Sequence, residues 1–230
     1  MKGRVKMAHM DYYNKDKIKV PSVTTVIGIL NKDGLIQWAN SIGKRGIDYK
    51  KFLNERALVG SVAHELIEAH LSDKNPALFC SNEIKSEATQ ILNTFKVATE
   101  GIKFYNHEFE LSLSSDRFGG TLDMLCDIEI NGELNTVLVD FKTSKKPYIT
   151  QFIQLGAYLE LLRLNNHPRY NDIKYCMIFS VNKSTCTFQY ITKENTLKYF
   201  TKMFLSLLDT YEIWSVVQLE GLNDSVTEVM

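Results

Sequence analysis

Cysteine is scarce in this 230-residue sequence, and no two of its four cysteines are close together. Successive cysteines are 46, 50 and 10 residues apart, from Cys80 through Cys126 and Cys176 to Cys186. A zinc site or an iron–sulfur cluster needs closely spaced thiolates, so neither is expected. The pattern predicts four reduced and mostly buried thiols, which suit an intracellular location better than a secreted one.

Net charge and long apolar runs are also missing. The 27 acidic residues balance the 27 basic ones, which excludes a protein that coats nucleic acid by charge alone but leaves a local basic groove open. The apolar stretch 23–30 is far too short to span a bilayer. Residues 1–10 are basic and lack the apolar core of a signal peptide. We therefore expect a cytoplasmic protein with no membrane contact.

What is present is the composition of an ordinary globular protein, with 44% hydrophobic and 23% charged residues. A chain of this length can bury a core without metal or disulfide crosslinks. No internal repeat and no Pro/Gly-rich linker divides it. We expect residues 1–230 to form a single domain, with a helical region at about 21–100, a sheet core at about 102–192 and a C-terminal helix at about 193–217.

Hydrophobic periodicity predicts the order of helices and strands. Helices are expected at 23–30, at 35–71 with interruptions near Gly43, Gly46 and Gly60, and at 83–99, 148–164 and 193–217. Strands are expected at 104–113, 121–130, 134–143, 173–181 and 185–191. This order suits a mixed α/β (α+β) fold, in which a central mixed sheet is flanked by helices, rather than a regularly alternating parallel fold.

The dipeptide Asn131-Gly132 separates two of these strands, and such a dipeptide is the strongest short signal for a two-residue hairpin loop. Such a loop sets Ile130 opposite Glu133, and the same register sets Asp123 opposite Asp140, provided that no bulge forms at Leu134-Asn135. Their Cβ atoms would then be about 5 Å apart on one face. Lys142 shares that face, because strand side chains alternate, while Val137, Val139 and Phe141 point to the other, core-facing side.

Two adjacent carboxylates repel each other unless a cation, a shared proton or a basic group lies between them. Oxygen ligands of this kind suit Mg²⁺ or Mn²⁺, and a nearby lysine can hold a water molecule and offset developing negative charge. A plain Asp–Asp–Lys salt-bridge cluster on a solvated sheet face is the structural alternative. Spacing alone does not separate the two interpretations.

Five segments in a particular order carry a resemblance to a known group of enzymes. They are Val20-Pro21-Ser22-Val23-Thr24, Gly60-Ser61-Val62-Ala63-His64, Gly120-Thr121-Leu122-Asp123, Val139-Asp140-Phe141-Lys142-Thr143-Ser144, and Gln154-x-x-x-Tyr158. Together they resemble the PD-(D/E)XK nuclease superfamily in its RecB-type exonuclease branch. Within that branch they are similar to the mitochondrial genome maintenance exonuclease group and its phage and bacterial relatives. The third motif reads Asp-x-Lys instead of Glu-x-Lys, which is normal in this branch.

The resemblance implies a restriction-endonuclease-like core and assigns roles to particular residues. Asp123, Asp140 and Lys142 would be catalytic, and Mg²⁺ or Mn²⁺ would be bound by His64, Asp123, Asp140 and the backbone carbonyl of Phe141. Lys142 would position the attacking water. Branch members with an iron–sulfur cluster carry one cysteine upstream and three clustered downstream. This chain lacks that set, so no cluster is expected.

Further residues have a functional and a structural interpretation side by side. Glu108 and Glu68 are candidates for supporting positions around the metal. Alternatively, Glu108 is a structural ion-pair partner and Glu68 is a solvated glutamate. Gln154 and Tyr158 share a helix face and would brace the site or touch DNA, or else are a surface glutamine and a half-buried tyrosine. The other candidates for bracing the site or binding DNA are Ser61, Thr143, Lys145 and Arg56.

Basic and aromatic residues alternate ahead of His64. Lys44, Arg45, Lys50, Lys51 and Arg56 are interleaved with Trp38, Tyr49 and Phe52. Such a mixture can guide a single strand through phosphate contacts and base stacking, or it can be a solvated helix face. A zinc-peptidase interpretation of 64–68 is disfavoured, because Glu68 replaces the second histidine of H-E-x-x-H.

The sequence therefore predicts a metal-dependent DNA exonuclease that acts on ends or single strands in replication, recombination or repair. A nuclease that cuts internally on the same fold and a non-catalytic DNA-binding module are the alternatives. DNA is the expected partner, with recombination or replication proteins as candidates. These motifs specify neither the oligomeric state nor the direction of degradation along a DNA strand. The absence of a targeting segment favours the phage or bacterial relatives over the mitochondrial group.

Overall fold

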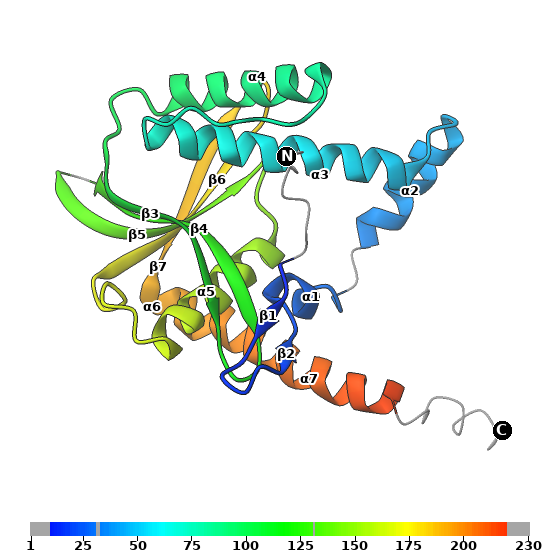
Figure 1. Ribbon diagram of the computed structural model, residues 1–230, viewed down its shortest axis with the longest axis vertical. Helices are drawn as coiled ribbons and strands as arrows, with labels where there is room; N and C mark the ends of the chain where they lie inside the picture. The colour runs from blue at the N-terminus through cyan, green and yellow to red at the C-terminus, as the bar shows by residue number, and fades with distance from the viewer. Residues whose placement is uncertain (1–9, 31–32, 131, 220–230) are drawn as a thin grey trace.

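A five-stranded sheet between two layers of helices forms the body of the protein (Figure 1). The computed structural model describes residues 10–30, 33–130 and 132–219. The strands are β3 (Phe104–Ser114), β4 (Gly119–Ile130), β5 (Glu133–Lys142), β6 (Ile173–Val181) and β7 (Cys186–Thr192), and they follow that order across the sheet. All neighbours are antiparallel except β5 and β6, which are parallel. The predicted fold class, a mixed sheet flanked by helices, is confirmed.

The hairpin of β4 and β5 has the predicted register. Its paired residues run from Ile130 opposite Glu133 to Met124 opposite Val139, with no shift between them. Gly132 has a φ of 80°, which glycine adopts without strain, while Asn131 lies outside the described residues. A two-residue loop thus fixes the pairing of every residue along the hairpin as far as Met124 and Val139.

One face of the sheet is covered by α3 (Tyr49–Leu71) and α4 (Asn82–Ala98). Val137, Val139 and Phe141 point into this layer, as the alternation predicts. Phe95 of α4 meets Phe141 edge-on, with the ring centroids 5.8 Å apart, and has no exposed surface. Burying each such side chain contributes about 1.5–3 kcal/mol. The core therefore reaches to within one residue of Asp140.

The other face is covered by α5 (Ile149–Leu164), which is the crossover between β5 and β6, together with α1 (Val23–Ile27) and the C-terminal helices. The predicted helix at 193–217 is three segments: α6 (Lys193–Asn195), the π-helical η1 (Thr196–Thr201) and α7 (Lys202–Leu219). Gly156 of α5 allows η1 to approach closely, because a Cβ atom there would lie 2.5 Å from the backbone nitrogen of Thr201. The Thr201 hydroxyl donates to the Gly156 carbonyl at 2.9 Å.

The N-terminal part differs from the prediction in its details. Two short strands, β1 (Tyr12–Tyr13) and β2 (Lys19–Val20), were not expected, and α1 ends at Ile27 rather than at residue 30. Ser22 caps α1, because its hydroxyl accepts from the Thr25 N–H at 3.0 Å. The predicted helical region 35–71 is two helices, α2 (Asp33–Lys44) and α3. Asp48 caps α3 by accepting from the backbone of Lys50 and Lys51.

The state of the cysteines and the apolar character of the helices were both subjects of expectations from the sequence. All four cysteines lie within the described ranges and are free thiols; Cys126 and Cys176 are buried, and Cys80 and Cys186 are partly buried. Across the described ranges, no helix has both the length and the apolar character that crossing a membrane requires.

Candidate active site

The site lies where β4 and β5 part. The paired ladder ends at Met124 and Val139, and the next pair in the same register is Asp123 and Asp140. Instead of a further ladder bond, the Asp123 carboxylate accepts a hydrogen bond from the Phe141 backbone N–H at 2.8 Å. The hairpin register therefore brings the two aspartates together as predicted, at the point where the strands open.

The opening also exposes the backbone edge of β5. In an extended strand the N–H and the carbonyl of one residue point to the same neighbouring strand. Because the Phe141 N–H reaches Asp123 on β4, the Phe141 carbonyl faces the same gap.

Asp140 is the most deeply buried acid of the site, with 1% of its surface exposed. Both of its carboxylate oxygens are buried; the Lys142 ammonium lies 2.5 Å from Oδ2, while Oδ1 has no hydrogen-bond donor among the described residues. Burial, and then the nearby charge of Asp123, raise the pKa of Asp140 although Lys142 opposes the shift. An acid that is costly to ionise is thus held beside the cation that could neutralise it.

Asp123 is the more acidic of the two carboxyls. Burial alone would raise its pKa, but His64, Lys142 and the Phe141 N–H together lower it. His64, from α3, places Nδ1 3.6 Å from Asp123 Oδ2. Its own pKa is lowered by burial but raised more by Asp123, so the net shift is upward. The imidazole also rests edge-on near the Phe141 ring, with centroids 6.0 Å apart.

The helix that carries His64 packs beside the end of β5. A Cβ atom on Gly60 would lie 3.4 Å from Thr143 Oγ1, which is an ordinary van der Waals distance. The prediction placed an interruption at Gly60, but the residue lies inside α3. The His64 motif therefore lies next to the residue that follows β5.

Gln154 and Tyr158 form a bracing pair beneath the carboxylates. The Gln154 amide donates to the Tyr158 hydroxyl at 2.6 Å, and Tyr158 is 4% exposed. Burial, and then the charges of Asp140 and Asp123, raise the pKa of Tyr158. Gly120 leaves room for the ring, because a Cβ atom there would lie 2.9 Å from Tyr158 Cε1. The tyrosine is therefore neutral and fixed below the site.

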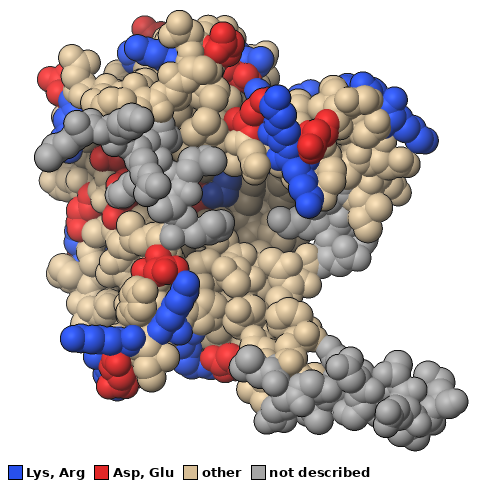
Figure 2. Space-filling view, turned by 45° about the vertical axis from the view of Figure 1, so that its right-hand side comes forward, with Lys and Arg blue, Asp and Glu red and all other residues tan. Residues whose placement is uncertain are grey.

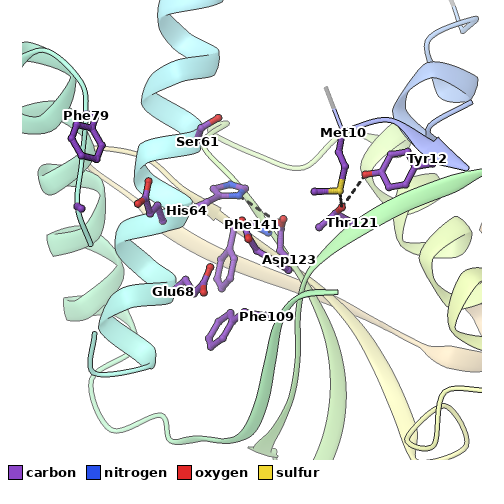
Figure 3. A pocket seen from close by; sticks show the side chains of 13 residues that line it. Met10, Tyr12, Ser61, His64, Glu68, Phe79, Phe109, Thr121, Asp123 and Phe141 are labelled. Carbon is purple, nitrogen blue, oxygen red and sulfur yellow. Dashed lines mark hydrogen bonds and ion pairs between the residues drawn. The ribbon is translucent and has the colours of Figure 1, made fainter. Parts of the chain in front are cut away.

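Residues of this cluster line two cavities. The first has a volume of about 660 Å³ and is lined by His64, Asp123 and Phe141 among others, and Figure 3 shows His64 and Glu68 projecting from α3 toward Asp123 and Phe141. The second has a volume of about 740 Å³, and Lys142 and Gln154 are among its lining residues. The catalytic candidates are thus divided between the two cavities, with His64 and Asp123 at the first and Lys142 at the second.

Some predicted residues lie in the cluster and others have different partners. Ser61 and Glu68 line the first cavity, and Lys145 is exposed beyond the end of β5. Glu108 binds Arg169 Nη1 at 3.0 Å and lies 3.3 Å from His167 Nε2, so it is part of an ion-pair network. Arg56 binds Glu87 of α4 through both guanidinium nitrogens.

Two glutamates that line the first cavity, Glu65 and Glu110, were not among the predicted site residues. The register of β3 and β4 pairs Leu111 with Leu122 and Phe109 with Met124, so Glu110 occupies the position opposite Asp123. The acid that β3 brings to the site is therefore Glu110 rather than Glu108. A prediction of the β3–β4 register could have found it, but β3 has a register shift between Tyr105 and Glu108 and a positive φ at Glu110.

The candidate metal ligands are mostly oxygen atoms together with one imidazole nitrogen, and such a set suits a divalent cation. In the part of the chain that the structure describes, no three His, Cys, Asp or Glu side chains already stand in a metal-binding arrangement. Asp140 Oδ1 is nonetheless buried and has no hydrogen-bond donor among the described residues, and natural proteins rarely leave such an atom unsatisfied. Asp123, Asp140, His64 and the Phe141 carbonyl are the residues that could supply ligands.

Comparisons with known proteins give only distant likenesses. No protein-family model matches the chain, and no curated protein matches it. Two solved structures of LHK-Exo are similar to this chain, each with a TM-score of 0.37. The one in complex with dAMP is 12% identical and covers 73% of this chain and 85% of its own. The other, described as an alkaline exonuclease from Laribacter hongkongensis, is 10% identical and covers 73% of this chain and 84% of its own. SSO0001 has a TM-score of 0.29 at 15% identity, over 64% of this chain and 84% of its own. These scores are too low to support a conclusion about function.

Proposed function

We propose that this protein is a metal-dependent nuclease that hydrolyses phosphodiester bonds of DNA and acts as an exonuclease on ends or single strands. The observation that carries the proposal is the convergence of Asp123, Asp140, Lys142 and His64 at the opening between β4 and β5. The motif resemblance to the RecB-type branch of the PD-(D/E)XK nucleases supports it, because the matching residues are the ones that meet. Roles in replication, recombination or repair follow from the same resemblance.

The side chains of the site divide into those that would hold Mg²⁺ or Mn²⁺ and those that would act on the phosphate. Asp123, Asp140, His64 and the Phe141 carbonyl would hold the ion. Bound there, it would supply Lewis acidity toward a phosphoryl oxygen and a more acidic water. Lys142 would leave Asp140 and place its ammonium against the phosphate, where it offsets the negative charge that develops in the transition state.

The supporting residues keep this arrangement in place before a substrate arrives. The Phe141 N–H fixes the Asp123 carboxylate, and Gln154 fixes the Tyr158 hydroxyl. A rigid, preorganised set of charges costs little reorganisation when the reaction occurs. The buried Asp140 argues against a non-catalytic DNA-binding module, since a buried carboxylate whose Oδ1 has no donor among the described residues destabilises a fold that gains nothing from it.

The test is cleavage of end-labelled DNA in linear and closed circular forms, each single- and double-stranded, with Mg²⁺, Mn²⁺ or EDTA. We expect the linear forms to be degraded with either metal and nothing to be degraded in EDTA. Cleavage of closed circles would favour internal cutting on the same fold. Binding without cleavage under every metal condition would favour the DNA-binding module and would contradict the proposal.

A further inference from the structure

The two cavities beside the catalytic candidates differ in the charged residues that line them. Acidic side chains line the first, where Glu65, Glu68 and Glu110 join Asp123, and this cavity also contains His64, a proposed metal ligand. Among the described residues, Lys142 is the one charged side chain that lines the second. Its ammonium attracts phosphate, so the second cavity can receive the part of a polyanionic strand next to that phosphate.

The walls of the second cavity are apolar and come from four helices. Trp38 comes from α2, Ile27 from α1 and Leu53 from α3, while Tyr148 and Ile149 stand at the start of α5. Tyr148 and Ile149 are consecutive residues that are 58% and 60% exposed, so they form an exposed apolar part of the pocket wall. Trp38 is held by the neighbouring ring of Phe52, with centroids 5.8 Å apart.

The arm above this cavity is basic. Within residues 44–56, which join α2 to the first half of α3, there are five basic and two acidic side chains. One of the two acids, Asp48, is used as the N-cap of α3. Figure 2 shows a hollow between this arm and the body of the molecule, with mostly uncharged walls and basic side chains on the arm. Basic groups on the rim and rings inside match a phosphate backbone with its bases turned inward.

We propose that the second cavity, between Trp38 and Tyr148, binds an unpaired nucleobase of the strand whose phosphate lies at Lys142. The proposal rests on the nuclease function above and adds the substrate class, an unpaired strand. A paired base has its faces covered by its neighbours and its edge held by its partner, so only an unstacked base can insert between the rings. Ring stacking tolerates any base, so the cavity confers preference for single strands and not for a sequence.

The test is tryptophan fluorescence, because the chain has two tryptophans, Trp38 and Trp214. Trp214 is 53% exposed on α7 and does not line either cavity. In a Trp214→Phe variant, fluorescence reports Trp38 alone. The probes are a single-stranded oligothymidylate and a blunt duplex of equal length, both titrated in EDTA so that neither is cleaved. We expect the single strand to quench Trp38 and the duplex to leave it nearly unchanged.

A second measurement places Tyr148 in the same pocket. Tyr148→Ala should weaken binding of the single strand by about tenfold or more, as expected for the loss of one base–ring stack. Tyr199→Ala is the matched control, because Tyr199 is an aromatic residue of η1 with 49% exposure outside both cavities, and it should bind like the parent. Both variants change exposed side chains, so circular dichroism is expected to show folded proteins.

The outcomes separate this inference from the nuclease proposal. Equal quenching by the single strand and the duplex would overturn the unpaired-base pocket, since it would indicate phosphate contact alone. Absence of quenching in a protein that cleaves DNA with Mg²⁺ or Mn²⁺ would overturn the pocket and leave the nuclease assignment intact. Single-strand quenching without cleavage under any metal would support the pocket and overturn the nuclease.

Discussion

The Phe141 backbone N–H donates to the Asp123 carboxylate at 2.8 Å, across the gap where β4 and β5 stop pairing. This one bond replaces a rung of the sheet with a side chain. It orients Asp123 toward the position occupied by Asp140 and Lys142, and it leaves the backbone edge of β5 open. The chemistry proposed for the protein depends on this local departure from regular sheet structure.

Binding of Mg²⁺ or Mn²⁺ should stabilise the folded protein. A ligand that binds only the folded state adds RT ln(1 + [L]/Kd), about 2.7 kcal/mol at one hundred times Kd. A thermal unfolding scan in EDTA and in excess metal should therefore show a rise in Tm. In Asp123→Asn the rise should be largely lost, because the carboxylate nearest His64 is neutralised. An equal rise in that variant would show that the ion binds elsewhere.

Glu110 and Glu108 should separate into a site residue and a structural residue. Glu110 stands at the register position opposite Asp123 and lines the first cavity, so Glu110→Gln should lower the cleavage rate by about 10–100-fold, as for groups around a metal site. Glu108 instead pairs with Arg169, so Glu108→Gln should lower the urea midpoint while cleavage per folded molecule stays near wild type. The reverse pattern would contradict the placement of the two acids.

Gly156 and Gly43 make a matched pair for the close contact between α5 and η1. A Cβ atom at Gly156 would lie 2.5 Å from the backbone of Thr201, whereas at Gly43 in α2 it would meet nothing within 4 Å. Gly156→Ala should therefore lower the free energy of unfolding by about 1–3 kcal/mol. Gly43→Ala should be neutral or stabilising by up to about 1 kcal/mol. Urea denaturation of both variants checks this, and a tolerated Gly156→Ala would show that the contact is less tight.

Asp127 should contribute acid-sensitive stability. Burial alone would raise its pKa, but hydrogen bonds from Thr136 and Asn106 and the pair with Arg169 lower it below the ordinary value of 3.8. Because the folded pKa is the lower one, its contribution is present at neutral pH and is lost as the pH falls through the folded pKa. Asp127→Asn breaks a partly buried pair and should cost about 3–5 kcal/mol at pH 7.

The difference in unfolding free energy between wild type and Asp127→Asn should then shrink once the pH falls below about 4, where the carboxyl of the unfolded chain becomes protonated. Urea denaturation across pH 2–7 in EDTA measures this difference. A constant difference across the range would mean that the ionised form of Asp127 is not what stabilises the network.

The elements that carry the site were predictable from the sequence because their signals are local. The Asn131-Gly132 signal predicts the pairing that runs from Ile130 and Glu133 to Met124 and Val139, and simple alternation separates Val139 from Asp140. The helix of His64 was found from its amphipathic pattern. Gln154 and Tyr158 share a helix face because they are four residues apart, and the structure joins them by a hydrogen bond.

What the sequence analysis missed depends on non-local or irregular geometry. Glu110 was overlooked because the register shift in β3 changes which residue of β4 each later residue of β3 lies opposite, so simple alternation along the strand does not give its position. The C-terminal helix is divided into α6, η1 and α7, and η1 is in contact with Gly156, 45 residues before Thr201 in sequence. The pocket between Trp38 and Tyr148 joins four helices, and no periodicity within one segment predicts such a meeting.

The most direct test of the central claim is single-turnover cleavage of end-labelled linear DNA by wild type, Asp140→Asn and Lys142→Ala, each with saturating Mg²⁺ or Mn²⁺. Lys174→Ala, which removes an exposed lysine paired with Glu133 on the far part of the sheet, is the control. Preorganised charges of this kind contribute about 10²–10³-fold or more. Both site variants should lose at least that factor while circular dichroism shows them folded, and Lys174→Ala should cleave like wild type. Wild-type cleavage rates in Asp140→Asn would contradict the assignment of the active site.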